Sequence, residues 1–322
     1  MKNIKRTLIT VAMLICGTAM AQTQPLEGPI KMIVPFAAGG GVDTAARLLA
    51  KQLGLNLNVP VIVENKPGAN GTIGGKYVQT AKPDGQTLLF SASTHALAKQ
   101  VMAKPPYDPQ TDFSAVARVG EAPLMMVIAP KLPQAKLSEV MAAAKQDPDK
   151  WTAALPALGA ASHLGTLMFA KQGDLPHLVT ATYRGTSPAL NDVAGGFVQI
   201  QIDAIVALQG MAKSGLVKPI MVTSAKRSSV MPNVPTAVES GYPKFVTGSW
   251  YGVWAPKSTP TDRIQYLNKA INTSMGQLTK AHAFDALGFE SVTEGVDDFK
   301  KYEAQYVSDS AELLKDAGFK PE

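Results

Sequence analysis

Short apolar runs alternate with segments of helical periodicity in the first third of the chain. The run 30–36 has strand length, and in 43–54 the apolar positions recur three or four residues apart before a glycine. Residues 59–65 form a second strand-like run, 72–81 a second helix-like segment, and 83–93 a turn followed by a third strand. This βαβαβ order predicts a parallel sheet with helices on both of its faces.

The same alternation continues to the C-terminus and predicts two α/β units. Two strand-like runs within 114–130 mark the break between the units, and 187–196 is predicted as a helix with a serine cap and terminal glycines. The apolar run 248–256 predicts the return crossing, and we expect the helical tail to pack back on the first unit. The two expected domains comprise 22–123 with 251–322, and 124–250.

The first 21 residues have the three parts of a secretory signal peptide. A basic start at 2–6 precedes a short apolar core, and the triplet A-M-A at 19–21 follows it. A transmembrane anchor is the alternative, but the apolar core is short for a bilayer span and ends at a cleavage site. We expect cleavage before Gln22 and a periplasmic mature protein.

Composition fits a well-packed globular protein, with 46% hydrophobic and 17% charged residues. The single cysteine, Cys16, lies inside the signal peptide, so the mature chain would hold no disulfide, thiolate metal site or cysteine nucleophile. Without Lys2, Lys5 and Arg6 the net charge falls from +6 to +3, with 28 basic against 25 acidic residues. This small, unclustered excess excludes nucleic acid as an expected partner and mildly favours small anions.

Three consecutive glycines, 39–41, follow the first predicted strand and raise the question of a phosphate-binding loop. A Walker loop needs a lysine after its last glycine, and a dinucleotide loop needs a glycine where Thr44 stands. Asp43 would also repel a pyrophosphate. We therefore expect no nucleotide and no other cofactor.

The residue types of a catalytic or metal site are present without the required spacing. No pair among His95, His163, His177 and His282 has metal-ligand spacing on a helix, and no G-x-S-x-G elbow occurs. Capping or packing is the simpler interpretation of each histidine. We expect a protein that is not an enzyme and that holds no metal.

Three loops of small residues, 37–44, 65–72 and 158–162, each follow a predicted strand and open a predicted helix. A helix N-terminus offers free N–H groups and a positive dipole end, and glycine lets an anion approach the backbone. Hydroxyl groups within 91–94 follow the third strand. Such ends converging at the carboxyl ends of strands would form an uncharged carboxylate receptor. The alternative is that these glycines only permit tight turns. For a single loop this alternative is favoured, but for three loops of the same kind a binding site is favoured.

The segments that carry these loops resemble one family. The stretches "IVPFAAGGGVDTAAR", "VIVENKPGANGTIGG", "YRGTSPALNDVAGGFVQIQID" and "WYGVWAPKSTP" stand in family order along nearly the whole mature chain. The chain thereby resembles the periplasmic solute-binding proteins of tripartite tricarboxylate transporters, the Bug family. The resemblance implies an α/β, two-domain periplasmic binding-protein fold of type II-like form. Its parallel-dominated sheets would be flanked by helices, with a hinged cleft between the domains.

The resemblance also implies which residues face the cleft. In the family, two loops act as a pincer on a ligand carboxylate, partly through ordered water, and the second domain supplies further contacts. Carried over to this sequence, the implied ligand-binding residues are Phe36, Ala37, Gly39, Gly40, Asp43, Ala69, Asn70, Thr72, Ser91, Ser93, Thr94, His95, Ala161, Ser162, His163 and Asp203.

Two positions depart from the family pattern. Asn70 replaces a frequent glycine and adds an amide donor that could contact the ligand. Ala204 follows Asp203 where the family often has asparagine, which leaves the chemistry of the distal ligand end open. Asp203 could accept a hydrogen bond from a ligand ammonium or hydroxyl group, or it could order backbone amides. A buried carboxylate beside an anionic ligand is costly, which favours the second interpretation.

The sequence thus predicts a monomeric, non-enzymatic receptor for a small carboxylate, either a dicarboxylate or an aromatic acid. It would close on its ligand and deliver it to inner-membrane transporter subunits. A periplasmic sensor of a signalling system would use the same cleft, and the chain alone does not separate sensing from transport.

Overall fold

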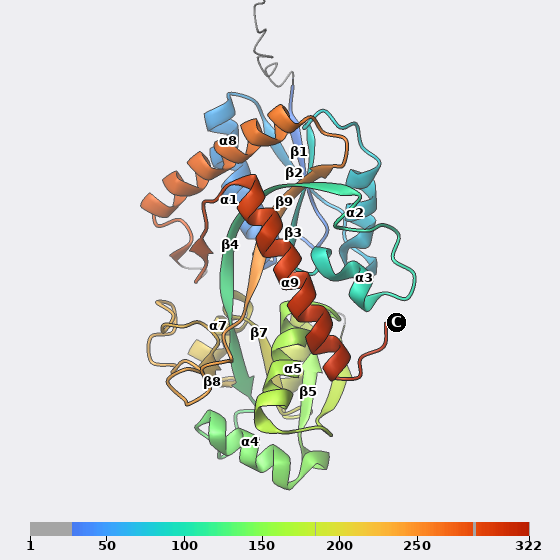
Figure 1. Cartoon of the computed structure of the whole chain (residues 1–322). Helices are drawn as coiled ribbons and strands as arrows, with labels where there is room; N and C mark the ends of the chain where they lie inside the picture. The colour runs from blue at the N-terminus through green and yellow to red at the C-terminus, as the bar shows by residue number, and fades with distance from the viewer. Residues whose placement is uncertain (1–27, 184, 286–287, 322) are drawn as a thin grey trace, which may run out of the picture.

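The computed structural model describes residues 28–183, 185–285 and 288–321. The predicted signal peptide, residues 1–21, lies outside the described residues. Two α/β domains stand end to end, joined by crossing strands and spanned by the last helix (Figure 1). In the part of the chain that is described, no helix is both long and apolar enough to cross a membrane.

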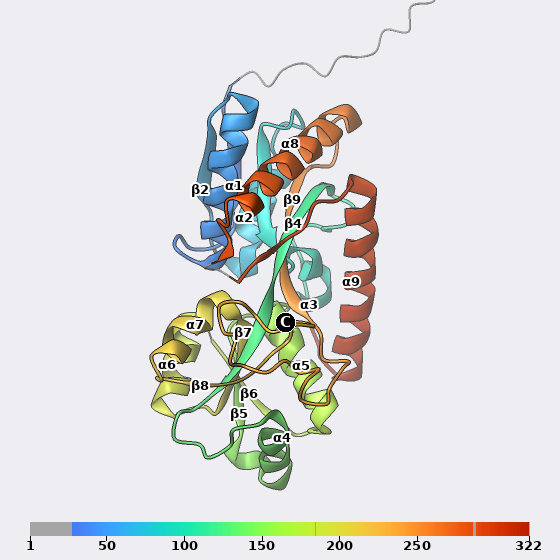
Figure 2. The same cartoon turned by 90° about the vertical axis from the view of Figure 1, so that its left-hand side faces the viewer.

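Parallel strands form one side of the first sheet, in the order β2 (Val61–Asn65), β1 (Ile30–Val34) and β3 (Thr87–Ala92). Helix α1 (Gly41–Leu57) connects β1 to β2, and helix α2 (Thr72–Gln79) connects β2 to β3. The βαβαβ order predicted from periodicity is confirmed. Because these strands run parallel, the loops at their carboxyl ends share one edge, which faces the second domain (Figure 2).

The strand β4 (Phe113–Ile128) belongs to both sheets. It pairs antiparallel with β9 (Gly248–Pro256) in the first domain, and its last residues pair with strands of the second domain. The two separate strands predicted in this region are therefore one strand, and that prediction is wrong. Register shifts, one of them between Arg118 and Gly120, interrupt the side-chain pattern while the backbone pairing continues.

The second sheet continues from β4 through β7 (Ile200–Ala204), β5 (Thr152–Leu155) and β6 (Val179–Thr182). Strand β5 is parallel to both of its neighbours, whereas β4 is antiparallel to β7 and to β8 (Lys218–Val222). The carboxyl ends of β5, β6 and β7 therefore lie at one edge, and this edge faces the first domain (Figure 2).

Each of these three parallel strands is followed by a helix. Helix α5 (Ala161–Gly173) follows β5, α6 (Thr186–Gly195) follows β6, and α7 (Ile205–Lys213) follows β7. Buried residues of α5 and of α4 (Leu137–Gln146) pack on one face of the sheet, and those of α6 and α7 pack on the other. The N-termini of α5, α6 and α7 are thereby directed toward the first domain.

The start of α6 differs from the sequence-based prediction. Its N-cap is Gly185, which has a φ of 113° that other residues adopt only with strain. Ser187 lies inside the first turn and is exposed, so the predicted serine cap is wrong. The hydroxyl group of Thr186 instead donates a 2.6 Å hydrogen bond to Asp203, which ties the start of α6 to the end of β7.

The two C-terminal helices have different positions. Helix α8 (Thr261–Lys280) packs beside α1 on the first domain, as expected for the tail. Helix α9 (Val296–Asp316) runs along both domains (Figures 1 and 2), and its Leu314 packs with Leu164 of α5. The tail therefore contacts the second domain as well as the first.

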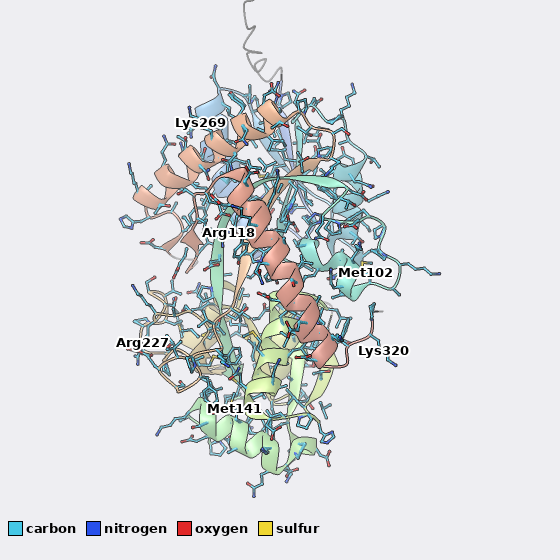
Figure 3. The ribbon with its side chains drawn as sticks, in the orientation of Figure 1. Met102, Arg118, Met141, Arg227, Lys269 and Lys320 are labelled. Atoms are coloured by element: carbon cyan, nitrogen blue, oxygen red, sulfur yellow. The ribbon has the colours of Figure 1, made fainter. Side chains whose placement is uncertain are left out.

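Aromatic and charged side chains attach α9 to the crossing strands. Trp250 and Trp254 of β9 are buried against this helix, and a fully buried large apolar side chain contributes about 1.5–3 kcal/mol. Arg118 lies on β4 where α9 crosses it (Figure 3). Its guanidinium donates to both carboxylate oxygens of Glu294 at 3.0 and 2.9 Å and lies 3.6 Å from the centre of the Tyr302 ring.

Short elements complete the described fold. They are β10 (Glu290–Ser291), α3 (Ala98–Val101) and the 3₁₀ helices η1 (Ala69–Gly71), η2 (His95–Leu97) and η3 (Pro148–Lys150). Of these, η1 belongs to the loop between β2 and α2 at the domain interface.

Candidate ligand site at the domain interface

Loops from the two domains are in direct contact where the carboxyl ends of their strands face one another. A Cβ added at Gly41, the first residue of α1, would lie 3.0 Å from Cγ1 of Val206 in α7 and 3.2 Å from the hydroxyl oxygen of Tyr251. Nδ2 of Asn70 donates a 2.9 Å hydrogen bond to the backbone carbonyl of Leu158, just before α5. Helix α1 therefore lies opposite α7, and η1 lies opposite the start of α5.

Helices α1, α2, α5, α6 and α7 begin at this interface, and none of their N-cap residues makes a side-chain capping hydrogen bond. Helices α2, α5, α6 and α7 also lack an acidic residue in the first turn, whereas α4, α8 and α9, which begin elsewhere, each carry one or two. An uncapped first turn keeps free N–H donors and the positive end of the helix dipole. These helix N-termini thus gather partial positive charge at the interface, which suits a carboxylate.

Asp43 is the acidic exception in α1, and its carboxylate is held by the protein. Oδ2 accepts hydrogen bonds from the Gly39 N–H at 2.9 Å and from Nε of Arg47 at 3.0 Å, and Oδ1 accepts one from Nδ2 of Asn65 at 2.8 Å. Burial alone would raise the pKa of Asp43, but these three partners together hold the pKa below its usual value. Asp43 therefore ties the glycine loop to the end of β2.

The tip of the first loop is open to solvent, where Ala37, Gly39 and Gly40 are exposed. Phe36 lies beneath this tip, and a Cβ added at Gly71 of the second loop would be 3.6 Å from Cζ of the Phe36 ring. The two predicted pincer loops are therefore neighbours, and the Phe36 ring forms an apolar surface between them.

The second loop has an unusual backbone. Ala69, Asn70 and Gly71 have φ values of 45°, 54° and 87°, so three successive residues lie in the left-handed region. The Thr72 hydroxyl donates to the Ala69 carbonyl at 2.7 Å and closes this turn onto the start of α2. The hydroxyl group of Thr72 is thus used within the loop.

His95 is buried inside the first domain, and the structure does not bring its side chain to the interface. The centre of its ring lies 4.7 Å from those of Phe113 and Trp254 and 5.4 Å from that of Tyr107, and Nδ1 lies 3.2 Å from the Tyr107 hydroxyl oxygen. Burial lowers the pKa of His95 to about 3, so the ring is neutral. Its position is that of a packing residue.

The hydroxyl residues next to His95 are buried as well. Ser91 lies within β3, and Ser93 donates its backbone N–H to the Trp250 carbonyl at 2.8 Å. Ser93 and Thr94 are 0% and 5% exposed, and they lie directly after β3 and before η2. This segment supports the carboxyl end of β3 from within the first domain.

His163 organises the loop that precedes α5. Its Nδ1 accepts a 3.1 Å hydrogen bond from the Gly159 N–H, and its ring contacts Phe319 of the C-terminal tail at a centroid distance of 5.1 Å. Burial lowers the pKa of His163 to about 4, which keeps Nδ1 unprotonated as the acceptor. Ala161 and Ser162 are buried in the first turn of α5, at the start of the helix that begins at the interface.

Asp203 lies at the end of β7 and orders the starts of two helices. Oδ2 accepts from Thr186 at 2.6 Å and Oδ1 accepts from the Ala204 N–H at 2.8 Å. Burial raises the pKa of Asp203, and the bonds from Thr186, Ala204 and Gln201 lower it by less. Of the two interpretations that the sequence left open, this geometry supports the ordering of backbone amides.

The carboxylates of Asp43 and Asp203 each stand apart from the other, and each accepts hydrogen bonds from protein donors. Within the described ranges, no group of three His, Cys, Asp or Glu side chains could hold a metal ion. The chemistry available at the interface is hydrogen bonding by backbone N–H groups and hydroxyl groups, which can bind an anion without reacting with it.

Three interface residues were missed by sequence reasoning. Tyr251 and Val206 both lie next to Gly41, and Thr186 bonds to Asp203. Tyr251 stands in the apolar run of β9, and Val206 follows an apolar strand, so their sequence surroundings indicate only core positions. The hydroxyl group of Thr186 beside Gly185 was the one available signal, but the helix start was assigned to Ser187 instead.

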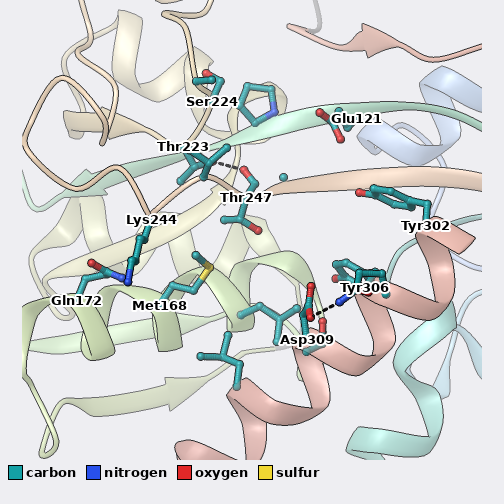
Figure 4. A pocket seen from close by; sticks show the side chains of 18 of the residues that line it. Glu121, Met168, Gln172, Thr223, Ser224, Lys244, Thr247, Tyr302, Tyr306 and Asp309 are labelled. Carbon is teal, nitrogen blue, oxygen red and sulfur yellow. Dashed lines mark hydrogen bonds between the residues drawn. The ribbon is translucent and has the colours of Figure 1, made fainter.

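A further pocket lies elsewhere, beside the crossing strands and against α9 (Figure 4). Its volume is about 870 Å³, and none of the predicted ligand-binding residues lines it. Tyr302, Tyr306 and Asp309 of α9 form one wall, and Met168 and Gln172 of α5 lie on the opposite wall.

Two α/β domains joined by crossing strands, with helix N-termini facing one another between them, define the class of two-domain binding proteins. The sequence profile described as "Tripartite tricarboxylate transporter family receptor" matches residues 45–319. The chain belongs to this family.

Relatives with similar sequence or structure agree with this assignment. Protein BugT of Bordetella pertussis is 35% identical over 99% of both chains. The solved periplasmic binding protein BugD is 35% identical, with a TM-score of 0.81 over 92% of this chain and 100% of that one. Two solved proteins of Rhodopseudomonas palustris are also similar. Rpa4515 with adipate is 28% identical, with a TM-score of 0.84 over 91% of this chain and 98% of that one. MatC with bound malate is 29% identical, with a TM-score of 0.79 over 89% of this chain and 98% of that one.

Proposed function

We propose that this protein is a periplasmic receptor that binds a small carboxylate between its domains. It delivers that carboxylate to the inner-membrane subunits of a tripartite tricarboxylate-type transporter. The observation that carries the proposal is the meeting of uncapped helix N-termini from both domains. Adipate and malate in two similar solved proteins make a dicarboxylate the first candidate. The receptor acts as a monomer and without catalysis.

Binding and domain closure are coupled in this proposal. A carboxylate at the interface receives N–H donors from both domains only when the domains are together, so it shifts the population toward the closed form. A Cβ added at Gly41 of the first domain would lie 3.0 Å from Cγ1 of Val206 in the second domain, so the two domains are close at this point. A small carboxylate is consistent with this close approach.

A thermal unfolding series tests the binding. The purified protein is heated with monocarboxylates, dicarboxylates, tricarboxylates and aromatic acids, with adipate and malate among them. A ligand at 100 times its Kd stabilises the folded state by about 2.7 kcal/mol, which is a readily measured rise in Tm. A flat response to the entire series would contradict the proposal.

The variant Gly40→Asp tests the place of binding. Gly40 is the N-cap of α1 with a φ of −74°, so aspartate fits the backbone and its carboxylate can itself accept the free N–H groups. We expect unchanged or higher stability in the absence of ligand and a lost carboxylate response. Gly276→Asp adds the same charge in α8, where a Cβ has nothing within 4 Å, and should keep the response.

Delivery to a transporter is tested in cells. Deletion of the gene should abolish uptake of the carboxylate found by the thermal series, and a plasmid copy should restore it. Normal uptake in the deletion strain, with loss of ligand-dependent gene induction, would refute transport in favour of sensing.

A further inference from the structure

Asn70 makes a direct hydrogen bond between the two domains. Its Nδ2 lies 2.9 Å from the backbone oxygen of Leu158, although 88 residues separate the two in sequence. Asn70 belongs to the second loop of the first domain, and Leu158 belongs to the loop before α5 in the second domain. The bond joins protein to protein, so it can form with or without a ligand at the interface.

The backbone at Asn70 does not require an asparagine side chain. Its φ of 54° and ψ of 32° are left-handed, a conformation that asparagine tolerates and that glycine adopts freely. A glycine would therefore build the same turn. What the asparagine adds at this position is its amide donor.

The acceptor loop is held firmly in the second domain. The Gly159 N–H donates to Nδ1 of His163 at 3.1 Å, and the Gly185 N–H donates to the Pro156 carbonyl at 3.0 Å. A Cβ added at Gly159 would lie 2.8 Å from Cγ1 of Val101 in the first domain, so the loop is also packed against α3. Because the loop is anchored on its own domain, the Asn70 bond depends on the position of one domain relative to the other.

We propose that Asn70 is a positioning residue that latches the two domains together and thereby slows ligand release. This inference rests on the proposed function, because it concerns the closed form of the same site. The latch lowers the free energy of the closed form both with and without ligand, so it raises the closed population in both states. Its removal should raise the dissociation rate, whereas the association rate should rise only by the gain in the open fraction of the ligand-free protein.

Asn70→Gly removes the donor and keeps the left-handed backbone. We expect the dissociation rate constant of bound adipate or malate to rise about 3- to 10-fold, the range for loss of one net hydrogen bond. The association rate constant should change by less than about two-fold. Asn70→Asp, which places a carboxylate oxygen against the Leu158 carbonyl, should raise the dissociation rate further.

Asn58→Gly is the matched control. Asn58 ends α1 with a φ of 55° and a ψ of 35° and is exposed, so the control reproduces the change in backbone freedom without touching the interface. Its rate constants should equal those of the wild type. An unchanged dissociation rate in Asn70→Gly, or a rise equal to that of Asn58→Gly, would overturn the latch.

A ligand-free measurement separates this inference from the proposed function. Small-angle X-ray scattering of the protein without carboxylate should give a larger radius of gyration for Asn70→Gly and Asn70→Asp than for wild type and Asn58→Gly. Identical scattering from all four proteins would refute the latch even if adipate or malate binds. A larger radius with no binding of any carboxylate would support the latch and contradict the proposed function.

Discussion

Glu303 of α9 is a buried carboxyl group whose charge opposes folding. Its side chain is 6% exposed, and Oε1 accepts a 3.1 Å hydrogen bond from Nε1 of Trp254. Burial raises the pKa of Glu303 to about 7, and the Trp254 bond lowers it by less. Glu303→Gln keeps the shape of the side chain and an acceptor for Trp254, and it removes the ionisation.

The expected gain in the free energy of unfolding follows from the difference between the pKa of Glu303 in the unfolded state and its pKa in the folded state. The ordinary value is 4.5 and the folded value is about 7. At about 1.36 kcal/mol for each pH unit, the linkage relation gives about 3 kcal/mol. Below pH 4.5 both the folded and unfolded states hold the proton, and the group costs nothing. Between pH 4.5 and 7 the unfolded state ionises first, so stability falls as pH rises, and above pH 7 the full cost is present.

Urea unfolding of wild type and Glu303→Gln at pH 4.5, 6 and 8 measures this effect. The difference in free energy of unfolding at pH 4.5 provides a baseline that includes any cost of the buried amide. Relative to that baseline, we expect the variant to gain about 3 kcal/mol by pH 8, because every other titrating group is the same in both proteins.

Glu312→Gln is the control, because Glu312 lies on the same helix and is exposed. It removes the same charge without removing a buried carboxylate. Parallel stability curves for wild type and Glu303→Gln, with a difference that stays constant within about 0.5 kcal/mol from pH 4.5 to pH 8, would refute the reasoning.

Three further substitutions test other contacts. Asp43→Ala should lower the free energy of unfolding at pH 7 by about 1–3 kcal/mol and weaken the carboxylate response. Because the folded-state pKa of Asp43 is lowered, its contribution to stability should fade as pH falls below 3.8, and urea unfolding at pH 3 and pH 7 would check this. Gly75→Ala should cost about 1–3 kcal/mol, seen as a lower Tm, because its Cβ would lie 2.1 Å from the Tyr107 hydroxyl oxygen. Lys145→Ala should change stability by less than about 0.5 kcal/mol in the same assay, since its 2.6 Å ion pair with Asp174 is exposed, and a loss above about 1 kcal/mol would be unexpected.

Local periodicity was sufficient to predict most of the fold. The βαβαβ order of the first sheet depends on apolar spacing within short windows, and the structure has it. The single strand β4 was not predictable in the same way, because its register shifts break the alternation of side chains while both sheets bury it. The reach of α9 onto α5 also depends on tertiary packing, through contacts such as Leu314 with Leu164.

The candidate site was predictable where backbone conformation decides it and less so where packing decides it. Glycine and alanine loops before helices are visible in the sequence, and the structure places them at the interface. The enclosure of His95 depends on aromatic residues from other segments, such as Phe113 and Trp254. The partner of Asn70 lies 88 residues away, and only the folded arrangement of the two domains brings Leu158 to it.

The crossing strands determine what kind of motion this molecule can make. Strands β4 and β9 are hydrogen-bonded to each other from the Phe113–Pro256 pair to the Pro123–Gly248 pair. A two-stranded ribbon resists stretching, because elongation would break its ladder, whereas ribbons of two strands adopt larger twists than wide sheets do. The two domains can therefore change their relative orientation through the ribbon, but they cannot move apart along its length without breaking its hydrogen bonds. In the proposed delivery, the transporter would distinguish loaded from empty receptor by the angle between two surfaces whose spacing along the ribbon is constant.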